Sequence, residues 1–325
     1  MFRVLDFGPD GSLEVYDGPE RAVPPPAGVV RWVDLTSSAP DVLELLRQRF
    51  LFHPLAIEDC AHLDQRPKLE EFQDHLFLVT QGLAHLGPRV KKLGVYELHA
   101  FLGERVLVTV HEGKMPTLDK VWERTRMRPS PIERGVDFVY YLLADGLVDL
   151  GFPILDCLND ELVEIEDRVL LQPKQRDLTR IFELRRHLVL MRKVLAPQRD
   201  TMAMLARRGD AHISERTSLY FRDVYDHLAR LTESVEANRD LLGNVIEAYM
   251  SSVSMRTNEI MKYLTLLSAV FLPLAFVVGF FGQNFENLPG LSNWVSSDAL
   301  MWVMIAICVG TPVGMVTWFK RQGWI

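Results

Sequence analysis

The sequence predicts an α+β membrane protein. An N-terminal cytoplasmic α/β domain is joined by a long stalk helix to two C-terminal transmembrane helices, and the stalk is continuous with the first of them. Three observations predict this fold. Strand-like and helical runs alternate over the first ~110 residues, residues 214–272 contain no proline, and two long runs near the C-terminus carry no charge.

Composition limits the classes of function. The 325 residues suffice for one large or two ordinary soluble domains, and the formal net charge of −7 excludes a basic nucleic-acid binder. The three cysteines are far apart and form no CxxC pair, which fits a reducing cytosol and gives neither a zinc site nor a disulfide framework. The N-terminus carries acids where a signal peptide needs a basic start, so we expect membrane insertion to be directed from the C-terminal end.

The α/β domain is expected over residues 1–135. PDVLELLRQRF is typical of a helix, and Gly103-Glu104 is typical of a hairpin turn between two strands. Four runs are rich in β-branched and aromatic residues and predict strands: RWVDL, HLFLVTQGL, YELHAFLG and RVLVTVH.

A helical hairpin is expected over residues 136–213. Its first arm repeats apolar residues every three or four positions, is strongly acidic, and ends before Pro173. Its second arm, residues 174–208, has ten Lys or Arg against three acids. The two arms either pair through these charges or present them to solvent.

The stalk helix is expected over residues 214–262, and nothing in the sequence stops it before the membrane. Together with the first span it would have 68 residues and a length of ~100 Å at ~1.5 Å per residue. Asn238 occupies one step of its apolar seam, where it either selects a register and oligomeric state or faces solvent. The other seam positions alternate steps of four and three, a coiled-coil spacing: Val224, Leu228, Leu231, Val235, Leu242, Val245 and Tyr249.

The two uncharged runs are residues 263–281 and 299–319, and each is long enough to cross a bilayer core of roughly 30 Å. The alternative, a pair of buried core helices, is disfavoured because soluble core helices rarely run so long without a charge. An external loop is expected over residues 282–298 and a cytoplasmic tail over residues 320–325.

The flanking charges predict the orientation. Arg256 and Lys262 precede the first span, and Lys320 and Arg321 follow the second, whereas the loop between the spans has no Lys or Arg. Because positive residues stay inside, both termini are expected in the cytoplasm, with the protein in the inner (plasma) membrane. Two helices cannot enclose an aqueous path, so transport of a solute would need several copies.

The chain resembles the CorA family of divalent metal cation transporters, within the superfamily of proteins with two membrane spans and a Gly-x-Asn tripeptide. The tripeptide GQN follows YFRDVYDH, NEIMKYLT and FLPL at the family's spacing. The likeness also runs back through HPLAIEDC, QRPKLEEF, FLGERVLVTVH, YYLLADGLVDLGFPILD and LMRKVLAP, and so covers nearly the whole chain.

The resemblance implies a homopentamer whose first spans line a central pore. Gly282, Gln283 and Asn284 of each copy would form a ring at the external mouth. Carboxamide oxygens there can accept hydrogen bonds from the water shell of a cation, which avoids the large cost of dehydrating Mg²⁺. The matching pore-facing positions are Asn258, Met261, Leu264, Leu272 and Ala275. An apolar stripe of this kind, without the resemblance, is an ordinary packing face.

The family is gated by divalent ions held between neighbouring cytoplasmic domains, and the matching carboxylates are Asp59 and Asp223. Read without the resemblance, Asp59 is a first-turn helix residue and Asp223 a solvated stalk residue. His53, Glu58 and His62 suggest a transition-metal cluster, but their spacing is unspecific. The resemblance implies no resident cofactor and no partner besides lipid and other copies. The divalent cations Mg²⁺, Co²⁺ and, in the alternative, Zn²⁺ are cargo or regulators.

Three functions remain open. The first is uptake of Mg²⁺ and Co²⁺. The second is transport of Zn²⁺ or other transition metals, by efflux or with protons, because Gln283 replaces the commoner methionine, as happens in ZntB-like relatives. The third is a membrane-anchored enzyme or sensor. No phosphate loop, nucleophile elbow or metal-hydrolase motif supports the third, so we expect no enzymatic activity.

Overall fold

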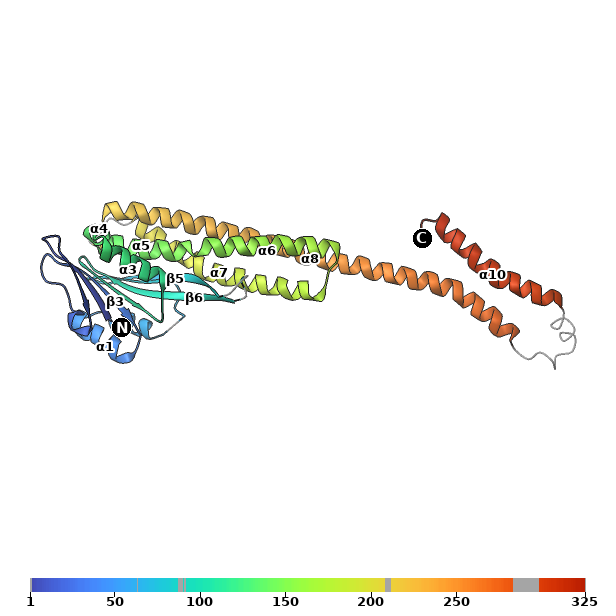
Figure 1. The fold of residues 1–325 in the computed structure, drawn as a ribbon, viewed down its shortest axis with the longest axis horizontal. Coiled ribbons are helices and arrows are strands. Elements are labelled where there is room, and N and C mark those ends of the chain that lie inside the picture. The colour runs from blue at the N-terminus through green and yellow to red at the C-terminus, as the bar shows by residue number, and fades with distance from the viewer. Residues whose placement is uncertain are drawn as a thin grey trace. The chain divides into compact units, whose positions relative to one another are not determined.

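The computed structural model describes residues 2–62, 64–86, 90, 92–207, 212–282 and 298–324 (Figure 1). These residues divide into two compact units, Met1–Ala248 and Tyr249–Ile325. The N-terminal unit is an α/β structure, and the C-terminal unit consists of helix. This architecture confirms the predicted α+β class.

A seven-stranded mixed sheet forms the centre of the N-terminal unit, in the order β2-β1-β3-β7-β6-β5-β4. Neighbouring strands are antiparallel except for β3 and β7, which are parallel. The strands are β1 Phe2–Phe7, β2 Leu13–Asp17, β3 Val30–Thr36, β4 Lys68–Glu71, β5 Leu76–Leu86, β6 Lys92–Leu102 and β7 Val106–His111.

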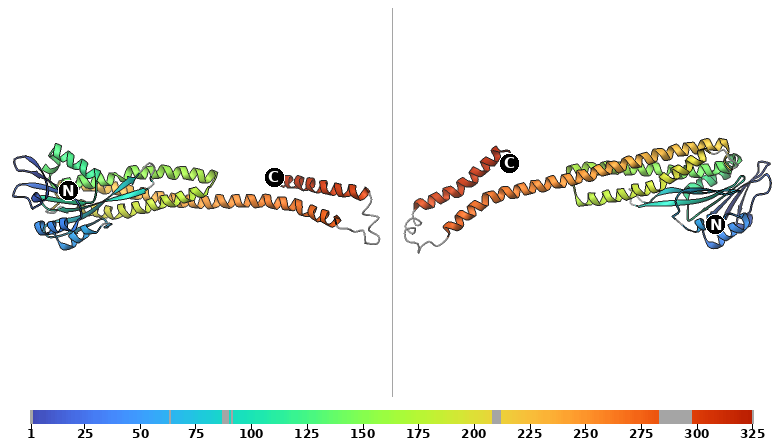
Figure 2. Two further views of the ribbon diagram at one scale, coloured as in Figure 1. Left: turned by 60° about the horizontal axis from the view of Figure 1, so that its bottom comes forward. Right: turned by 180° about the vertical axis from the view of Figure 1, so that it is seen from behind.

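Helices cover both faces of this sheet (Figures 1 and 2). Helices α1 and α2 pack on one face, whereas α3, α5 and α7 lie on the other. The helices are α1 Pro40–Phe50, α2 Pro54–Ala61, α3 Pro116–Met127, α4 Ser130–Glu133, α5 Val136–Asp149, α6 Gly151–Leu171, α7 Gln175–Arg207, α8 Glu215–Phe281 and α10 Asp298–Arg321, with a short 3₁₀ helix at Pro19–Arg21.

The predicted strand and helix runs are confirmed. RWVDL lies in β3, and PDVLELLRQRF is α1. HLFLVTQGL, YELHAFLG and RVLVTVH match β5, β6 and β7 except for one terminal residue each: His75, Gly103 and Arg105. Successive residues of a strand point to opposite faces of the sheet, and five successive residues of β3 are buried, so both of its faces are covered. Val33 packs toward α1 and α2, whereas the Trp32 ring lies 4.8 Å from that of Trp122 on α3. Strands β1, β2 and β4 were not predicted.

The charged arms of the predicted hairpin pair in part. Arg180 of α7 forms an ion pair with Glu161 of α6 at 2.6 Å, whereas Asp156 and Asp160 remain exposed. Helix α6 ends at Leu171, two residues before Pro173. Both alternatives therefore apply, each to a different part of the helix surface.

Helix α8 confirms the continuous stalk, because it runs for 67 residues from Glu215 to Phe281. Within the N-terminal unit its seam is buried against the chain's own helices, with Val224, Leu228 and Leu231 at 0% exposure. The ring centroid of Phe221 lies 6.0 Å from that of Tyr140 on α5. Asn238 is 9% exposed, so the solvent-facing alternative is wrong. The seam spacing therefore serves packing inside one chain.

Within the described residues, three helical stretches are long and apolar enough to cross a membrane: Val136–Leu171, Glu215–Phe280 and Trp302–Arg321. The apolar window of the first is 61% buried inside the N-terminal unit, as in a core helix, whereas those of the other two are only 6% buried. A helix that exposes an uncharged surface on nearly all sides suits a lipid environment or contacts with further helices.

An aromatic cluster ends the C-terminal unit. Gly323 has a φ of +71°, which turns the chain after α10. The backbone N–H of Trp324 then donates a hydrogen bond to the backbone carbonyl of Phe319 at 3.0 Å. The Trp324 ring stacks on that of Phe319 at 5.9 Å, and Trp318 lies 6.1 Å from Trp324. Aromatic rings of this kind favour the boundary between hydrocarbon and headgroups.

Replacing a seam residue should destabilise the N-terminal unit. We expect Leu228→Ala to lower the free energy of unfolding by about 2–5 kcal/mol, because Leu228 is fully buried and its truncation leaves a cavity. Leu219→Ala is the matched control on the same helix. Leu219 is 62% exposed, so its truncation should change stability by less than about 0.5 kcal/mol. Equal shifts in thermal unfolding for the two variants would contradict a buried seam.

Candidate functional site

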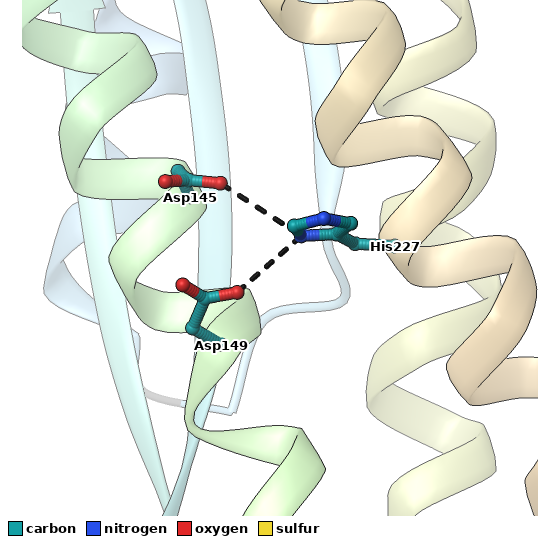
Figure 3. Close-up of side chains that lie close together, drawn as sticks. All are labelled: Asp145, Asp149 and His227. Carbon is teal, nitrogen blue, oxygen red and sulfur yellow. Dashed lines mark ion pairs between the residues drawn. The ribbon is translucent and has the colours of Figure 1, made fainter.

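Two carboxylates and an imidazole meet between α5 and α8 in the N-terminal unit (Figure 3). Asp145 and Asp149 lie four residues apart on α5 and therefore share one face of it. His227 reaches them from α8, with its Nδ1 3.3 Å from an oxygen of Asp149 and 4.0 Å from one of Asp145. Asp223, one turn earlier on α8, places an oxygen 3.9 Å from His227 Nε2. We call these four residues the α5–α8 cluster.

The cluster holds more negative charge than its surroundings neutralise. Burial, followed by repulsion from Asp149 and Asp223, raises the pKa of Asp145 to about 6, although His227 opposes this rise. The Nδ1 atom of His227 is buried without a hydrogen-bond partner, and its ring packs edge-on against Phe152 at 5.6 Å. A cation bound between the carboxylates would relieve this repulsion.

The donor atoms suit a divalent metal. The ligand atoms of Asp145, Asp149 and His227 lie within 4.8 Å of one another. Carboxylate oxygens are the donors that Mg²⁺ prefers, and an imidazole adds affinity for Co²⁺, Ni²⁺ or Zn²⁺. Within the described part of the chain, no other group of His, Cys, Asp or Glu has this arrangement.

The two predicted regulatory carboxylates lie in different surroundings. Asp223 belongs to the α5–α8 cluster and keeps 62% of its side chain exposed. Asp59 forms an ion pair with Lys68 of β4 at 2.6 Å. It lies in the last turn of α2, so its reading as a first-turn residue is wrong. A metal bridge between Asp59 and Asp223 of neighbouring subunits stays a prediction.

Of the three residues suggested as a transition-metal cluster, His53 has a role in local structure. His53 caps the N-terminus of α2 by accepting the N–H of Leu55 at 3.3 Å, and its ring stacks on Phe72 at 4.8 Å. His53, Glu58 and His62 are not brought together with metal-ligand spacing among the described residues.

The predicted pore positions lie along the exposed surface of α8. Leu272, Leu264 and Met261 are 73%, 62% and 59% exposed, and Asn258 and Ala275 are also exposed. Gly282 ends the helix with its N–H bonded to the Val278 carbonyl at 2.8 Å. A Cβ on Gly282 would lie 2.9 Å from that carbonyl oxygen, so a side chain there needs a backbone shift. Gln283 and Asn284 lie outside the described residues.

Three members of the α5–α8 cluster were not predicted: Asp145, Asp149 and His227. The sequence contains a signal for each half, because DGLVD spaces two acids by four residues and DVYDH spaces Asp223 and His227 likewise. Pairing these two helical faces requires knowing that α5 and α8 pack together, and periodicity does not show this.

The raised pKa of Asp145 predicts how metal-free stability depends on pH. Because its pKa rises from 3.8 to about 6 on folding, the folded state binds this proton more tightly than the unfolded state. The resulting destabilisation is present above pH 6 and is lost as pH falls from 6 toward 4. In the presence of a chelator, we expect the unfolding temperature to rise as the pH falls from 7 to 5.

Asp145→Asn should flatten this pH profile, whereas Asp156→Asn, which removes an exposed carboxylate from α6, should leave it unchanged. Identical pH profiles for the wild type and Asp145→Asn would contradict the assignment. Thermal unfolding followed by tryptophan fluorescence measures all three.

Comparison with known proteins identifies the family. Residues 27–321 match the family described as CorA-like Mg²⁺ transporter protein. YfjQ of Bacillus subtilis is 35% identical over 293 residues, covering 90% of this chain and 89% of that protein. The cobalt/magnesium transport protein CorA of Thermotoga maritima is 33% identical over 299 residues, covering 90% and 83%. The zinc transport protein ZntB of Yersinia pseudotuberculosis is 24% identical over 298 residues, covering 90% and 88%.

Among solved structures, the CorA magnesium transporter from Methanocaldococcus jannaschii superposes with a TM-score of 0.82 at 23% identity, covering 99% of this chain and 98% of that one. This likeness shows the fold: a soluble α/β part, a long helix and a C-terminal helix. The family match over 27–321 and the identities above 30% lead to one conclusion. The chain belongs to the CorA-like Mg²⁺ transporter family.

Proposed function

We propose that the chain is the subunit of a homopentameric transporter that carries divalent metal cations, Mg²⁺ and Co²⁺ in particular, across the cytoplasmic membrane. The observation that carries this proposal is the composition of α8. One helix combines a buried seam in the N-terminal unit with an uncharged, exposed span, in a chain that matches a transporter family over 27–321.

The number of spans per chain supports an oligomer. Two helices per chain enclose no aqueous path, whereas a ring of first spans would surround one. The large exposed apolar side chains of α8, including Leu264 and Leu272, would then be covered by other copies or line a narrow path that excludes water until it widens. The family resemblance supports five copies.

Charge distribution supports an orientation with both termini in the cytoplasm. The residues before the first span and after the second include Arg256, Lys262, Lys320 and Arg321, whereas the loop between the spans has no Lys or Arg. An inside-negative potential then drives a divalent ion inward by about 4.6 kcal/mol per 100 mV, twice the single-charge value. Uptake needs no other source of energy.

The ring of Gly282, Gln283 and Asn284 would select the ion at the external mouth. Neutral carboxamide oxygens bind a hydrated cation through its water, so the ion keeps most of its shell and leaves readily. The tight approach of Gly282 to the Val278 carbonyl supports a requirement for glycine where the chain leaves the helix.

The α5–α8 cluster would sense cytoplasmic metal. Asp59 of a neighbouring subunit and Asp223 are the carboxylates that the family resemblance assigns to gating. Asp145, Asp149 and His227 extend this set with three donors that one subunit brings together. Bound metal would neutralise the cluster and hold α8 in place, whereas its loss would restore repulsion and favour opening.

A second candidate is transport of Zn²⁺ in the manner of ZntB-like proteins, by efflux or coupled to protons. Gln283 in place of methionine and the 24% identity to a zinc transport protein favour it. All nine histidines precede residue 228, so the span itself offers no imidazole ligand for zinc. Liposome flux of Mg²⁺, Co²⁺, Zn²⁺ and Ni²⁺, with and without a pH gradient, separates the two candidates.

Asn284→Ala should abolish metal flux into liposomes while leaving oligomeric assembly intact, because it removes the acceptor for the ion's water shell. Asn287→Ala in the same loop is the matched control and should retain at least half of the wild-type flux. Wild-type flux through Asn284→Ala would remove this residue from ion selection. Stopped-flow fluorescence of an entrapped metal indicator measures the rate.

Asp223→Ala should weaken inhibition by internal metal, raising the half-inhibitory Mg²⁺ concentration by about tenfold or more, because the cluster loses one carboxylate. Asp226→Ala removes an exposed carboxylate three residues further along α8 and should leave the half-inhibitory Mg²⁺ concentration unchanged. Flux is measured at several Mg²⁺ concentrations on the side of the N-terminal unit. An unchanged inhibition curve would exclude Asp223 from regulation.

A further inference from the structure

An open groove of about 350 Å³ lies beside the α5–α8 cluster, between α3 and α5. Asp145 and Asp149 line it on the α5 side, and Lys120 and Arg124 line it on the α3 side. Val121 and Leu150 also line the groove and contribute apolar surface. The groove therefore presents cations, carboxylates and apolar walls to the same ligand.

The two cations are available to such a ligand. Lys120 and Arg124 lie one turn apart on α3, and both side chains are exposed. Neither side chain has an ion-pair or hydrogen-bond partner among the residues that the structure describes, whereas Arg126 on the same helix pairs with Glu123 at 2.7 Å. The charge of Arg126 is therefore paired within the chain, whereas the charges of Lys120 and Arg124 remain available to a ligand.

The cluster alone gives Mg²⁺ an incomplete coordination sphere. Mg²⁺ takes six oxygen ligands in proteins, usually one or two carboxylates together with water and the phosphates of a ligand. Asp145 and Asp149 supply the carboxylates, and Lys120 and Arg124 supply the positive charge that phosphate groups need. A pocket of a few hundred Å³ with apolar walls is also of the size that holds a nucleoside.

We propose that this groove binds a nucleoside di- or triphosphate as its magnesium complex, with the metal at Asp145 and Asp149 and the phosphates at Lys120 and Arg124. The regulatory consequence rests on the proposed transport function: the N-terminal unit would respond to magnesium chelated by nucleotide as well as to the free ion. The carboxylates repel a polyphosphate without its metal, so binding depends on the cation.

This dependence separates the proposal from simple attraction between phosphate and two basic residues. With attraction alone, Mg²⁺ would compete for the phosphates and weaken binding, and chelator would strengthen it. In the proposed site, Mg²⁺ bridges the carboxylates and the phosphates, and chelator abolishes binding.

The test is isothermal titration of the full-length protein in detergent with ATP, ADP, AMP and inorganic tripolyphosphate, each in Mg²⁺ and in chelator. We expect ATP and ADP to bind in Mg²⁺, with at least tenfold weaker binding in chelator and for AMP. Tripolyphosphate should bind at least threefold more weakly than ATP, because it lacks the nucleoside. Comparable binding of ATP in chelator would overturn the proposal, and equal binding of tripolyphosphate would overturn the nucleoside assignment.

Variants locate the site. The double substitution Lys120→Gln with Arg124→Gln should weaken Mg²⁺·ATP at least tenfold, and Asp145→Asn should weaken it similarly. Arg128→Gln, an exposed charge just beyond α3, is the matched control and should bind as the wild type does. All three substituted basic residues are exposed, so folding should be retained, and thermal unfolding verifies it.

Wild-type affinity in the double variant would overturn the groove as the site. Failure of this proposal is distinguishable from failure of the proposed function, because flux and nucleotide binding are separate measurements. Metal flux without nucleotide binding removes only the groove assignment. Nucleotide binding without flux removes the transporter and leaves the groove.

Discussion

The burial of one apolar seam along α8 is the interaction on which the rest of the structure depends. Val224, Leu228 and Leu231 fix the helix against the helices of its own N-terminal unit. The same helix continues to Phe281 and changes from an amphipathic surface to one that is uncharged on every side. A single helix therefore combines a segment suited to packing in a water-soluble unit with a segment suited to lipid, and its polarity changes between them.

Electrostatics give this helix a second role. His227 and Asp223 lie on the part of α8 that the seam holds, and they face two carboxylates of α5. Burial and repulsion raise the pKa of Asp145, so its ionised form destabilises the folded N-terminal unit. A proton or a bound cation would reduce the repulsion among the carboxylates. In the proposed function, the part of α8 at the cluster would sense cytoplasmic metal, and its exposed span would line the path of the ion. Because α8 is one continuous helix and helices are rigid elements, it physically connects the cluster with the exposed span.

Some parts of the fold could be predicted from sequence because their patterns are local. Strands β3, β5, β6 and β7 contain dense apolar runs, whereas β2 and β4 have only five and four residues and no buried position. Strand β1 is as long as β7, but Arg3 and Asp6 interrupt its apolar run. The error at Asp59 is also local. Pro54 opens α2 and His53 caps it, so Asp59 falls in the last turn, and proline at the first helical position could have indicated this.

The α5–α8 cluster could not be predicted in the same way. Its four members lie on two helices about eighty residues apart in sequence, and only the packing of the seam brings them together. The seam spacing predicts a helix with one buried face, but it is equally compatible with a coiled coil between chains and with packing inside one chain. Recognition of the family supplied the pore and gating positions, because neither periodicity nor charge distinguishes a pore-lining face from a packing face.

The central claim is that several copies of α8 surround one axis, and the mass of the particle in lipid tests it most directly. Native mass spectrometry of the protein released from lipid nanodiscs should give five times the 37.2 kDa of the chain, about 186 kDa. A single 37.2 kDa species, under conditions in which the protein transports metal, would contradict the account.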